Sequence, residues 1–118
     1  MADIHPDAMA SRFRGYLPVV VDVETAGFNA STDALLEVAM VVMDMDERGM
    51  LTPGDSMSAN IAPFEGANFE QSALDFTGID PHDPDRNAEN EETALAGMFK
   101  SIRKAMKAKG CKRAILVG

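Results

Sequence analysis

The stretch LPVVVDVETAGF, Leu17–Phe28, decides the expected fold of this chain. Its first half is an apolar run rich in valine, which favours a buried β-strand. Asp22 and Glu24 follow at positions two apart, and side chains two apart project from the same face of a strand. Two carboxylates held together in an apolar setting repel each other and lose solvation unless a cation lies between them. The stretch therefore predicts a strand that carries a pair of acids for a cation.

A divalent metal ion is the cation that this acid pair indicates. Carboxylate oxygens are hard ligands that suit Mg²⁺ or Mn²⁺, and no Cys or His is nearby to favour Zn²⁺. The alternative is that Asp22 and Glu24 lie where the strand frays into a solvated loop, since D-x-E is a short and common pattern. The following residues favour the metal site, because a turn at Thr25–Gly27 leads to one aromatic residue, Phe28, in a small and polar loop.

The rest of the chain predicts three strands in succession, then helices and a last strand. Strand, strand, strand, helix, strand indicates an α/β or α+β sheet of mixed direction, and the first three strands form an antiparallel meander. Residues 1–11 are expected to be a flexible leader, and residues 80–89 an exposed acidic loop. The expected elements are strands at 17–23, 36–44, 57–61 and 113–117, a short helix at 71–76 and a long amphipathic helix at 91–109.

The composition is that of one domain, and the distribution of charge is compatible with a nucleic-acid partner. The chain has 118 residues, of which 46% are hydrophobic, enough for a core of its own. The net charge is −8, but all 19 acids lie in residues 3–92. Seven of the 11 basic residues lie in residues 100–113, and Arg12 and Arg14 precede the first strand. Local potential steers a polyanion, although basic residues near a helix C-terminus are also favoured by the helix dipole alone.

The cysteine and histidine content favours neither thiol nor histidine chemistry. A single cysteine, Cys111, cannot form an internal disulfide, which indicates the cytoplasm, and it is expected to pack as a small apolar residue. His5 and His82 are expected to be exposed loop residues. No apolar run is long enough to span a membrane, and residues 1–11 lack the pattern of a secretory signal.

Several motifs together resemble one enzyme family. A hydrophobic strand, D-x-E-T, a glycine and an aromatic residue resemble the first motif of the DEDD-family, proofreading-type 3′→5′ exonucleases. Further segments are similar to the branch of that family that trims tRNA: RFRG at 12–15, PFEGAN at 63–68, GIDP at 78–81 and KGCKRAI at 109–115. The resemblance covers about residues 12–118. It implies a ribonuclease H-like mixed β-sheet flanked by helices, with strand 17–23 central and strand 113–117 parallel beside it.

The resemblance also implies roles for individual residues. Asp22 and Glu24 would be catalytic residues that bind two Mg²⁺ ions, with Mn²⁺ as a substitute. Phe28 and Phe76 would stack on terminal bases, although Phe76 beside Leu74 on a short helix is also typical of a core position. The family position that carries a base-contacting Glu in some relatives is Ser72 here, so no base readout is assigned to it. Phosphates would be bound by the four basic residues Arg12, Arg14, Lys107 and Arg113.

The function implied is that of a 3′→5′ exoribonuclease that trims tRNA and other structured RNAs and also accepts single-stranded DNA. The resemblance implies a homodimer, in which the basic residues of one subunit bring RNA to the site of the other. A DNA proofreading subunit and a non-catalytic nucleic-acid-binding protein are the alternatives. The family pattern requires an Asp, a His and a last Asp after residue 118. We therefore expect residues 12–118 to be the N-terminal portion of a single exonuclease domain, inactive alone.

Overall fold

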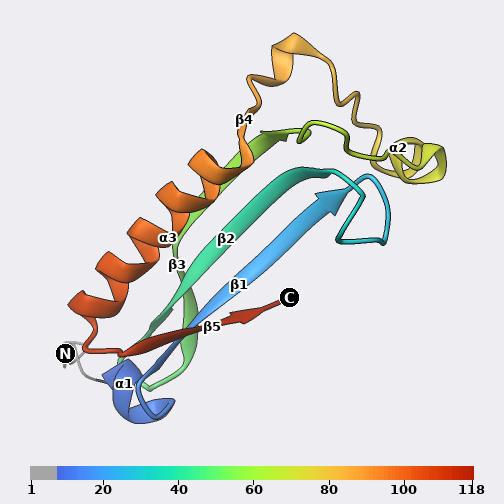
Figure 1. The fold of residues 1–118 in the computed structure, drawn as a ribbon. Helices are drawn as coiled ribbons and strands as arrows, with labels where there is room; N and C mark the ends of the chain where they lie inside the picture. Colours follow the sequence, from blue (N-terminus) through green and yellow to red (C-terminus); the bar gives the residue numbers. More distant parts are fainter. Residues whose placement is uncertain (1–7) are drawn as a thin grey trace. The chain divides into compact units, whose positions relative to one another are not determined.

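The computed structural model describes residues 8–118 (Figure 1). Every strand and helix expected from the sequence is present, with β3 considerably longer than the predicted strand 57–61. The expected acidic loop at 80–89 contains one turn of 3₁₀ helix, and a two-residue strand begins at its last residue. The elements are α1 (Ala8–Arg12), β1 (Tyr16–Thr25), β2 (Leu35–Met45), β3 (Leu51–Ala62), α2 (Gln71–Thr77), η1 (Pro84–Arg86), β4 (Glu89–Asn90), α3 (Glu91–Ala108) and β5 (Arg113–Val117).

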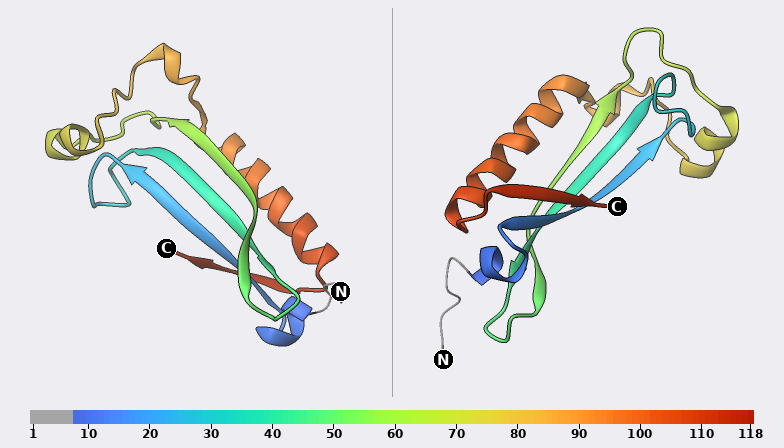
Figure 2. Two further views of the ribbon diagram at one scale, coloured as in Figure 1. Left: turned by 180° about the vertical axis from the view of Figure 1, so that it is seen from behind. Right: turned by 60° about the horizontal axis from the view of Figure 1, so that its bottom comes forward.

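The strands form one five-stranded sheet of mixed direction in the order β4-β3-β2-β1-β5. The first three strands alternate in direction, as Figure 1 shows. β5 pairs in parallel with the first half of β1, with Tyr16 opposite Arg113 and Val20 opposite Val117 (Figure 2). A parallel neighbour requires a crossover connection, which α3 provides. The predicted α/β class and the parallel placement of strand 113–117 beside strand 17–23 are confirmed.

The chain divides into two compact units, to which β1, β2, β3 and α3 each contribute residues. The first unit comprises the described part of Met1–Val21 together with Met40–Met57 and Gly97–Gly118. The second comprises Asp22–Ala39 and Ser58–Ala96. The four basic residues named above belong to the first unit, and the acid pair, Phe28 and Phe76 belong to the second.

The core of the first unit is built from apolar positions at strand and helix spacing. Leu17 and Val19, two apart in β1, are fully buried, and Met98 and Ile102, four apart in α3, are almost so. These spacings place each pair on one face of its element. The beginning of β1 is therefore buried, but Val20 and Val23 are 41% and 46% exposed, so the expected buried strand over 17–23 holds only for its first residues.

Helix α1 departs from the expectation of a flexible leader at 1–11. Residues 8–12 are helical, and Met9 is only 2% exposed. The backbone N–H groups of Phe13 and Gly15 donate to the carbonyls of Met9 and Ala10, which closes the helix. A buried methionine ties this segment to the core, so the leader expectation does not hold for residues 8–11. Residues 1–7, including His5, lie outside the described residues.

The core of the second unit holds α2 in place. Ala26, Ala34 and Leu36 are fully buried, and Leu74 of α2 packs against this cluster. The helix ends where Gly78 adopts the left-handed conformation and donates its N–H to the carbonyl of Leu74. Because Leu74 faces the core, the opposite side of α2 is left to solvent.

Candidate active site and basic surface

Asp22 and Glu24 line one depression of about 390 Å³ in the second unit. Asp22 is exposed and Glu24 is partly exposed. Both acids lie within β1 two residues apart, so the alternation of the strand puts them on one face, as expected. The neighbouring strands β2 and β3 complete the lining with Glu37, Val38, Ala39, Ser58, Ala59 and Asn60.

The donor set of this depression suits a hard divalent cation. Its polar side chains offer carboxylate, hydroxyl and amide oxygens, and neither Cys nor His contributes to the lining. Such oxygens are the ligands that Mg²⁺ and Mn²⁺ prefer. Across residues 8–118, no group of three or more His, Cys, Asp or Glu side chains is arranged to hold a metal ion. Asp22 and Glu24 are thus two acids from β1 in one depression, and metal binding by the pair stays a prediction.

Two exposed phenylalanines line a second, larger cavity of about 750 Å³. Phe28 lies in the loop after β1 and is fully exposed, and Phe76 lies on α2 and is 90% exposed. Glu24 lines this cavity as well as the depression that holds Asp22. The alternative that Phe76 is a core residue is thus wrong in this structure, because Leu74 takes the inward position.

The aromatic cavity suits a base better than a phosphate. Three carboxylates line it, from Glu24, Asp33 and Glu70, and Ser72 adds a hydroxyl. Like charges repel, so a phosphate would be disfavoured among these acids. A base, by contrast, offers a flat face to an aromatic ring and N–H donors to a carboxylate. The sequence analysis missed Asp33 and Glu70, since neither belongs to a recognisable motif.

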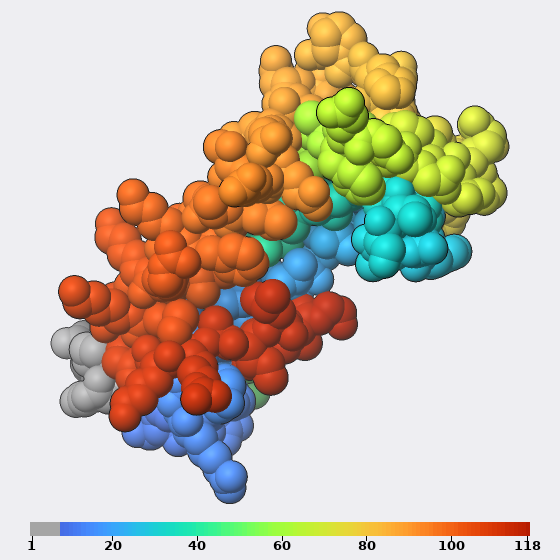
Figure 3. Space-filling model, in the orientation of Figure 1, coloured from blue at the N-terminus to red at the C-terminus, as the bar shows by residue number. Residues whose placement is uncertain are grey.

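The four basic residues Arg12, Arg14, Lys107 and Arg113 are all exposed. The N–H groups of Lys112 and Arg113 donate to the carbonyl of Gly15, at 2.8 and 3.2 Å. Figure 3 shows the end of α3 and β5 lying over the residues of α1 and the start of β1. The two segments that carry these basic residues, about 100 positions apart in the chain, therefore meet in the first unit. We call Arg12, Arg14, Lys107 and Arg113 the basic surface.

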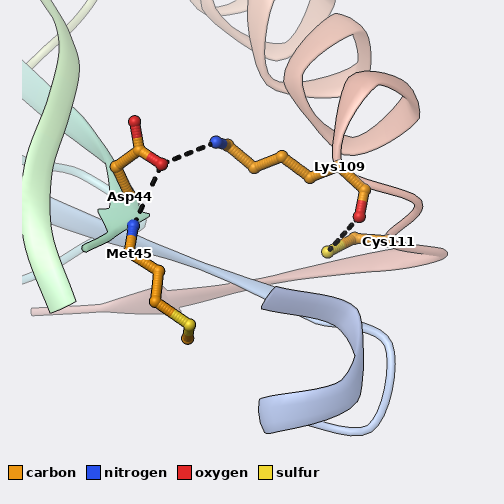
Figure 4. Close-up of polar contacts among 4 residues, drawn as sticks. All are labelled: Asp44, Met45, Lys109 and Cys111. Atoms are coloured by element: carbon orange, nitrogen blue, oxygen red, sulfur yellow. Dashed lines mark hydrogen bonds and ion pairs between the residues drawn. The ribbon is translucent and has the colours of Figure 1, made fainter. Parts of the chain in front are cut away.

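Lys109, which is not part of the basic surface, forms an ion pair. Its ammonium lies 3.0 Å from Asp44, which also accepts a hydrogen bond from the N–H of Met45 (Figure 4). The bond from Lys109 and the bond from Met45 hold the pKa of Asp44 below its usual range. Nearby, Cys111 is buried, and burial raises the pKa of its thiol. A buried, protonated thiol matches the expected packing role of Cys111.

The acidic loop uses its carboxylates to cap local turns. Asp80 accepts from the N–H of His82, and Asp83 accepts from the N–H of Asp85. His82 is exposed, as expected, and its ring lies edge-on to Phe69 with centroids 5.4 Å apart. His82 lines neither of the two hollows described above.

Comparison with known proteins identifies the class. Residues 19–118 match the family described as Exonuclease, which is most of the chain. The chain therefore belongs to this exonuclease family. In the part that the structure describes, no helix is both long and apolar enough to cross a membrane.

Within the family, the chain is similar to ribonuclease T, the branch to which its motifs pointed. It is 61% identical over 110 residues to ribonuclease T of Hahella chejuensis and 61% identical over 113 residues to that of Marinobacter nauticus. These alignments cover 93% and 96% of this chain but 50% and 51% of the relatives. The chain thus spans about half the length of the curated relatives it matches.

Solved structures support the fold. A product-bound structure of exonuclease I matches with a TM-score of 0.56 at 23% identity, over 74% of this chain and 19% of that protein. E. coli exonuclease I in complex with a dT13 oligonucleotide matches with a TM-score of 0.54, also at 23% identity, over 74% of this chain and 18% of that one. At this identity the match bears on the fold alone, and the expected ribonuclease H-like exonuclease fold is confirmed.

Proposed function

We propose that this chain belongs to a 3′→5′ exoribonuclease of the ribonuclease T type, which trims the 3′ ends of tRNA and other structured RNAs and accepts single-stranded DNA. One observation carries the proposal: Glu24 lines both the depression that holds Asp22 and the cavity that holds Phe28 and Phe76. A terminal base stacked in the aromatic cavity would therefore have its phosphodiester next to the acid pair. Aromatic rings suit this task because every unpaired base exposes a π-face.

Asp22 and Glu24 would hold the divalent ions, two Mg²⁺ per site, with Mn²⁺ as a substitute. Such ions, when bound, activate water and stabilise the leaving oxygen of a phosphodiester. The carboxylates of this chain would fix the ions on one face of β1. Phe28 and Phe76 would hold the terminal base and thereby orient the bond to be cleaved. Following the family resemblance, we propose that the general base is the histidine that the family pattern requires after residue 118; His82 lines neither hollow.

The basic surface would bind the RNA backbone. Its four side chains are exposed and come from segments that the Gly15 carbonyl holds together. Phosphate contacts position a nucleic acid without reading its sequence. Following the family resemblance, we propose a homodimer in which this surface of one subunit serves the site of the other. The cytoplasmic location expected from the single cysteine stays a prediction.

The acid pair can be tested in the whole protein with Asp22→Asn and Glu24→Gln. Each change keeps the size of the side chain and removes its negative charge. We expect release of mononucleotides from a labelled oligonucleotide to fall by at least about 100-fold, because losing one charge-stabilising group at an active site costs this much. Asp55→Asn, an exposed carboxylate of β3 in the other unit, is the matched control. Near-normal turnover by either site variant at saturating Mg²⁺ would refute the assignment.

The two alternative functions differ from the proposed one in preferred substrate or in the release of product. A proofreading subunit would prefer a mismatched primer end over the 3′ end of tRNA, whereas the proposed enzyme would prefer tRNA. The basic surface favours tRNA trimming over proofreading. A binding protein without activity would retain oligonucleotides and release no mononucleotide. Measuring cleavage and binding on both substrates with the same preparation separates the three.

A further inference from the structure

The loop that carries Phe28 is built around one buried carboxylate, that of Asp33, which is only 9% exposed. Its Oδ2 accepts a hydrogen bond from the N–H of Asn29 at 2.9 Å. Its Oδ1 accepts one from the side-chain amide of Asn68 at 2.8 Å and one from the hydroxyl of Thr32 at 3.1 Å. Three donors from two separate segments thus converge on a single side chain.

Asn68 connects this carboxylate to the segment that leads into α2. Its side-chain amide also donates to Glu70 at 2.8 Å. Its backbone N–H donates to the carbonyl of Thr32, and its carbonyl accepts from Ala34. The N–H of Glu70 then donates to the carbonyl of Ala26. The Phe28 loop and the segment before α2 are therefore joined by backbone and side-chain bonds, and α2 carries Phe76.

Gly27 leaves room for this arrangement. A Cβ placed on Gly27 would lie 2.1 Å from Oδ2 of Asp33 and 2.9 Å from Cγ of Glu70. Both distances are far inside van der Waals contact, so only a hydrogen fits there. The hydrogen bonds from Asn68 and Asn29 hold the pKa of Asp33 below its usual range. The group that Gly27 accommodates is accordingly a carboxylate at neutral pH.

We propose that Asp33 is a positioning residue that holds the Phe28 loop against the segment before α2 and so sets how Phe28 and Phe76 together receive a terminal base. The proposal rests on the function proposed above. Asp33 acts through Phe28, because each of its oxygens already accepts a hydrogen bond from the protein. Without those bonds the loop would move, and a base would meet one ordered aromatic ring in place of two.

The first test needs no nucleic acid. Fluorophenylalanine is incorporated into the whole protein, and the Phe28 resonance is assigned with a Phe28→Leu variant. In Asp33→Asn, an NH₂ group replaces one of the two acceptor oxygens, so at least one of the three donors loses its hydrogen bond. We therefore expect the Phe28 signal to shift, and to narrow as the loop becomes mobile. Asp75→Asn, an exposed carboxylate on α2, is the matched control and should leave the Phe28 signal unchanged. An unaltered Phe28 signal in Asp33→Asn would overturn the proposal.

The second test is a double-mutant cycle with Phe28→Ala, read as KM and kcat on a single-stranded oligonucleotide. Asp33→Asn should raise KM by about fivefold to tenfold, within the range that base stacking contributes, and change kcat by less than about twofold. The double variant should bind no worse than Phe28→Ala alone. If the KM of the double variant rises by the product of the two single increases, Asp33 contributes independently of Phe28 through direct contact with the base. That result would overturn the positioning role.

Two further outcomes distinguish a failure of this proposal from a failure of the proposed exonuclease function. If Phe28→Ala binds the oligonucleotide as tightly as the unaltered protein does, the proposed stacking on Phe28 is wrong. The fluorine measurement alone then decides whether the loop depends on Asp33. If Asp33→Asn does not fold, Asn68→Ala removes one of the three donors and keeps the Asp33–Asn29 bond. It should move the Phe28 signal in the same direction by a smaller amount, and no movement would overturn the proposal.

Discussion

The ammonium of Lys109 lies 3.0 Å from the carboxylate of Asp44, joining the residue after α3 to the end of β2. Lys109 lies outside the basic surface, and its charge is engaged by Asp44. The pair is only partly shielded, with 23% of the Lys109 side chain and 44% of the Asp44 side chain exposed. The contribution of the ion pair to the stability of the protein is therefore modest, and it depends on pH.

Asp44→Asn should lower the stability of the protein by about 0.5 kcal/mol at neutral pH, since exposed ion pairs contribute little after solvent screening. The pKa of Asp44 is lower in the folded state, so its contribution is present above the unfolded pKa, near 3.8. It is lost as the pH falls through the lower, folded value. Thermal unfolding of both proteins from pH 7 to pH 3 checks this. The difference should shrink towards the acid end, and a constant difference would contradict the assigned cause.

Replacing the four residues of the basic surface by Ala should weaken RNA binding for every sequence. The slope of affinity against salt should flatten by about 0.7 per lost contact on single strands, or about 2.8 for all four. Cleavage of a saturating short substrate should change less than affinity. The control is a double Ala variant at the exposed residues Arg48 and Lys100. Parallel salt slopes with equal affinities would show that the basic surface only complements the helix dipole.

Phe28→Ala and Phe76→Ala should each weaken binding of a single-stranded 3′ end by about fivefold or more, because one stacked ring is lost. The loss should disappear on an oligonucleotide whose terminal nucleotides lack bases. Phe64→Ala is the control, since Phe64 is 39% exposed and lines neither hollow. Equal losses on natural and abasic ends would argue that the two rings act on the backbone or on the fold.

The 118-residue chain produced by itself should show no metal-dependent exonuclease activity. Its described acid pair supplies two carboxylates, whereas a two-metal site needs more ligands and a proton acceptor. It should also be marginally stable, because Ile115, Leu116 and Val117 of β5 are about half exposed. Robust trimming of a labelled 3′ end by the purified chain, free of contaminating nuclease, would prove this prediction wrong.

Local pattern alone determined the elements that carry the candidate site. The alternation of β1 placed Asp22 and Glu24 on one face, because side chains in a strand repeat every two residues. Gly78 ended α2 and the 3.6-residue period marked α3, since both depend on neighbours in sequence. Their position two apart within β1 agrees with the predicted shared face, while their metal binding stays a prediction.

The positions of Phe76 and Leu74 show where local pattern was insufficient. Residues two apart on a helix point in nearly opposite directions, so only one of the two could face the core. The buried cluster of Ala26, Ala34 and Leu36 selected Leu74. Helix α1 was likewise decided by packing, because the burial of Met9 holds a segment whose sequence gives no strong helix signal.

Long-range pairing decided the remaining features. β3 extends back to Leu51 through Pro53 and Gly54, which are poor strand formers, because pairing within the sheet outweighs propensity. The bond between Asp33 and Asn68 joins positions 35 apart, and nothing near either residue indicates its partner. Sequence by itself thus determined the strand that bears the acids and the family to which the chain belongs. Only the tertiary structure decided which side chains hold the Phe28 loop, because hydrogen bonds between distant segments follow no repeating pattern in the sequence.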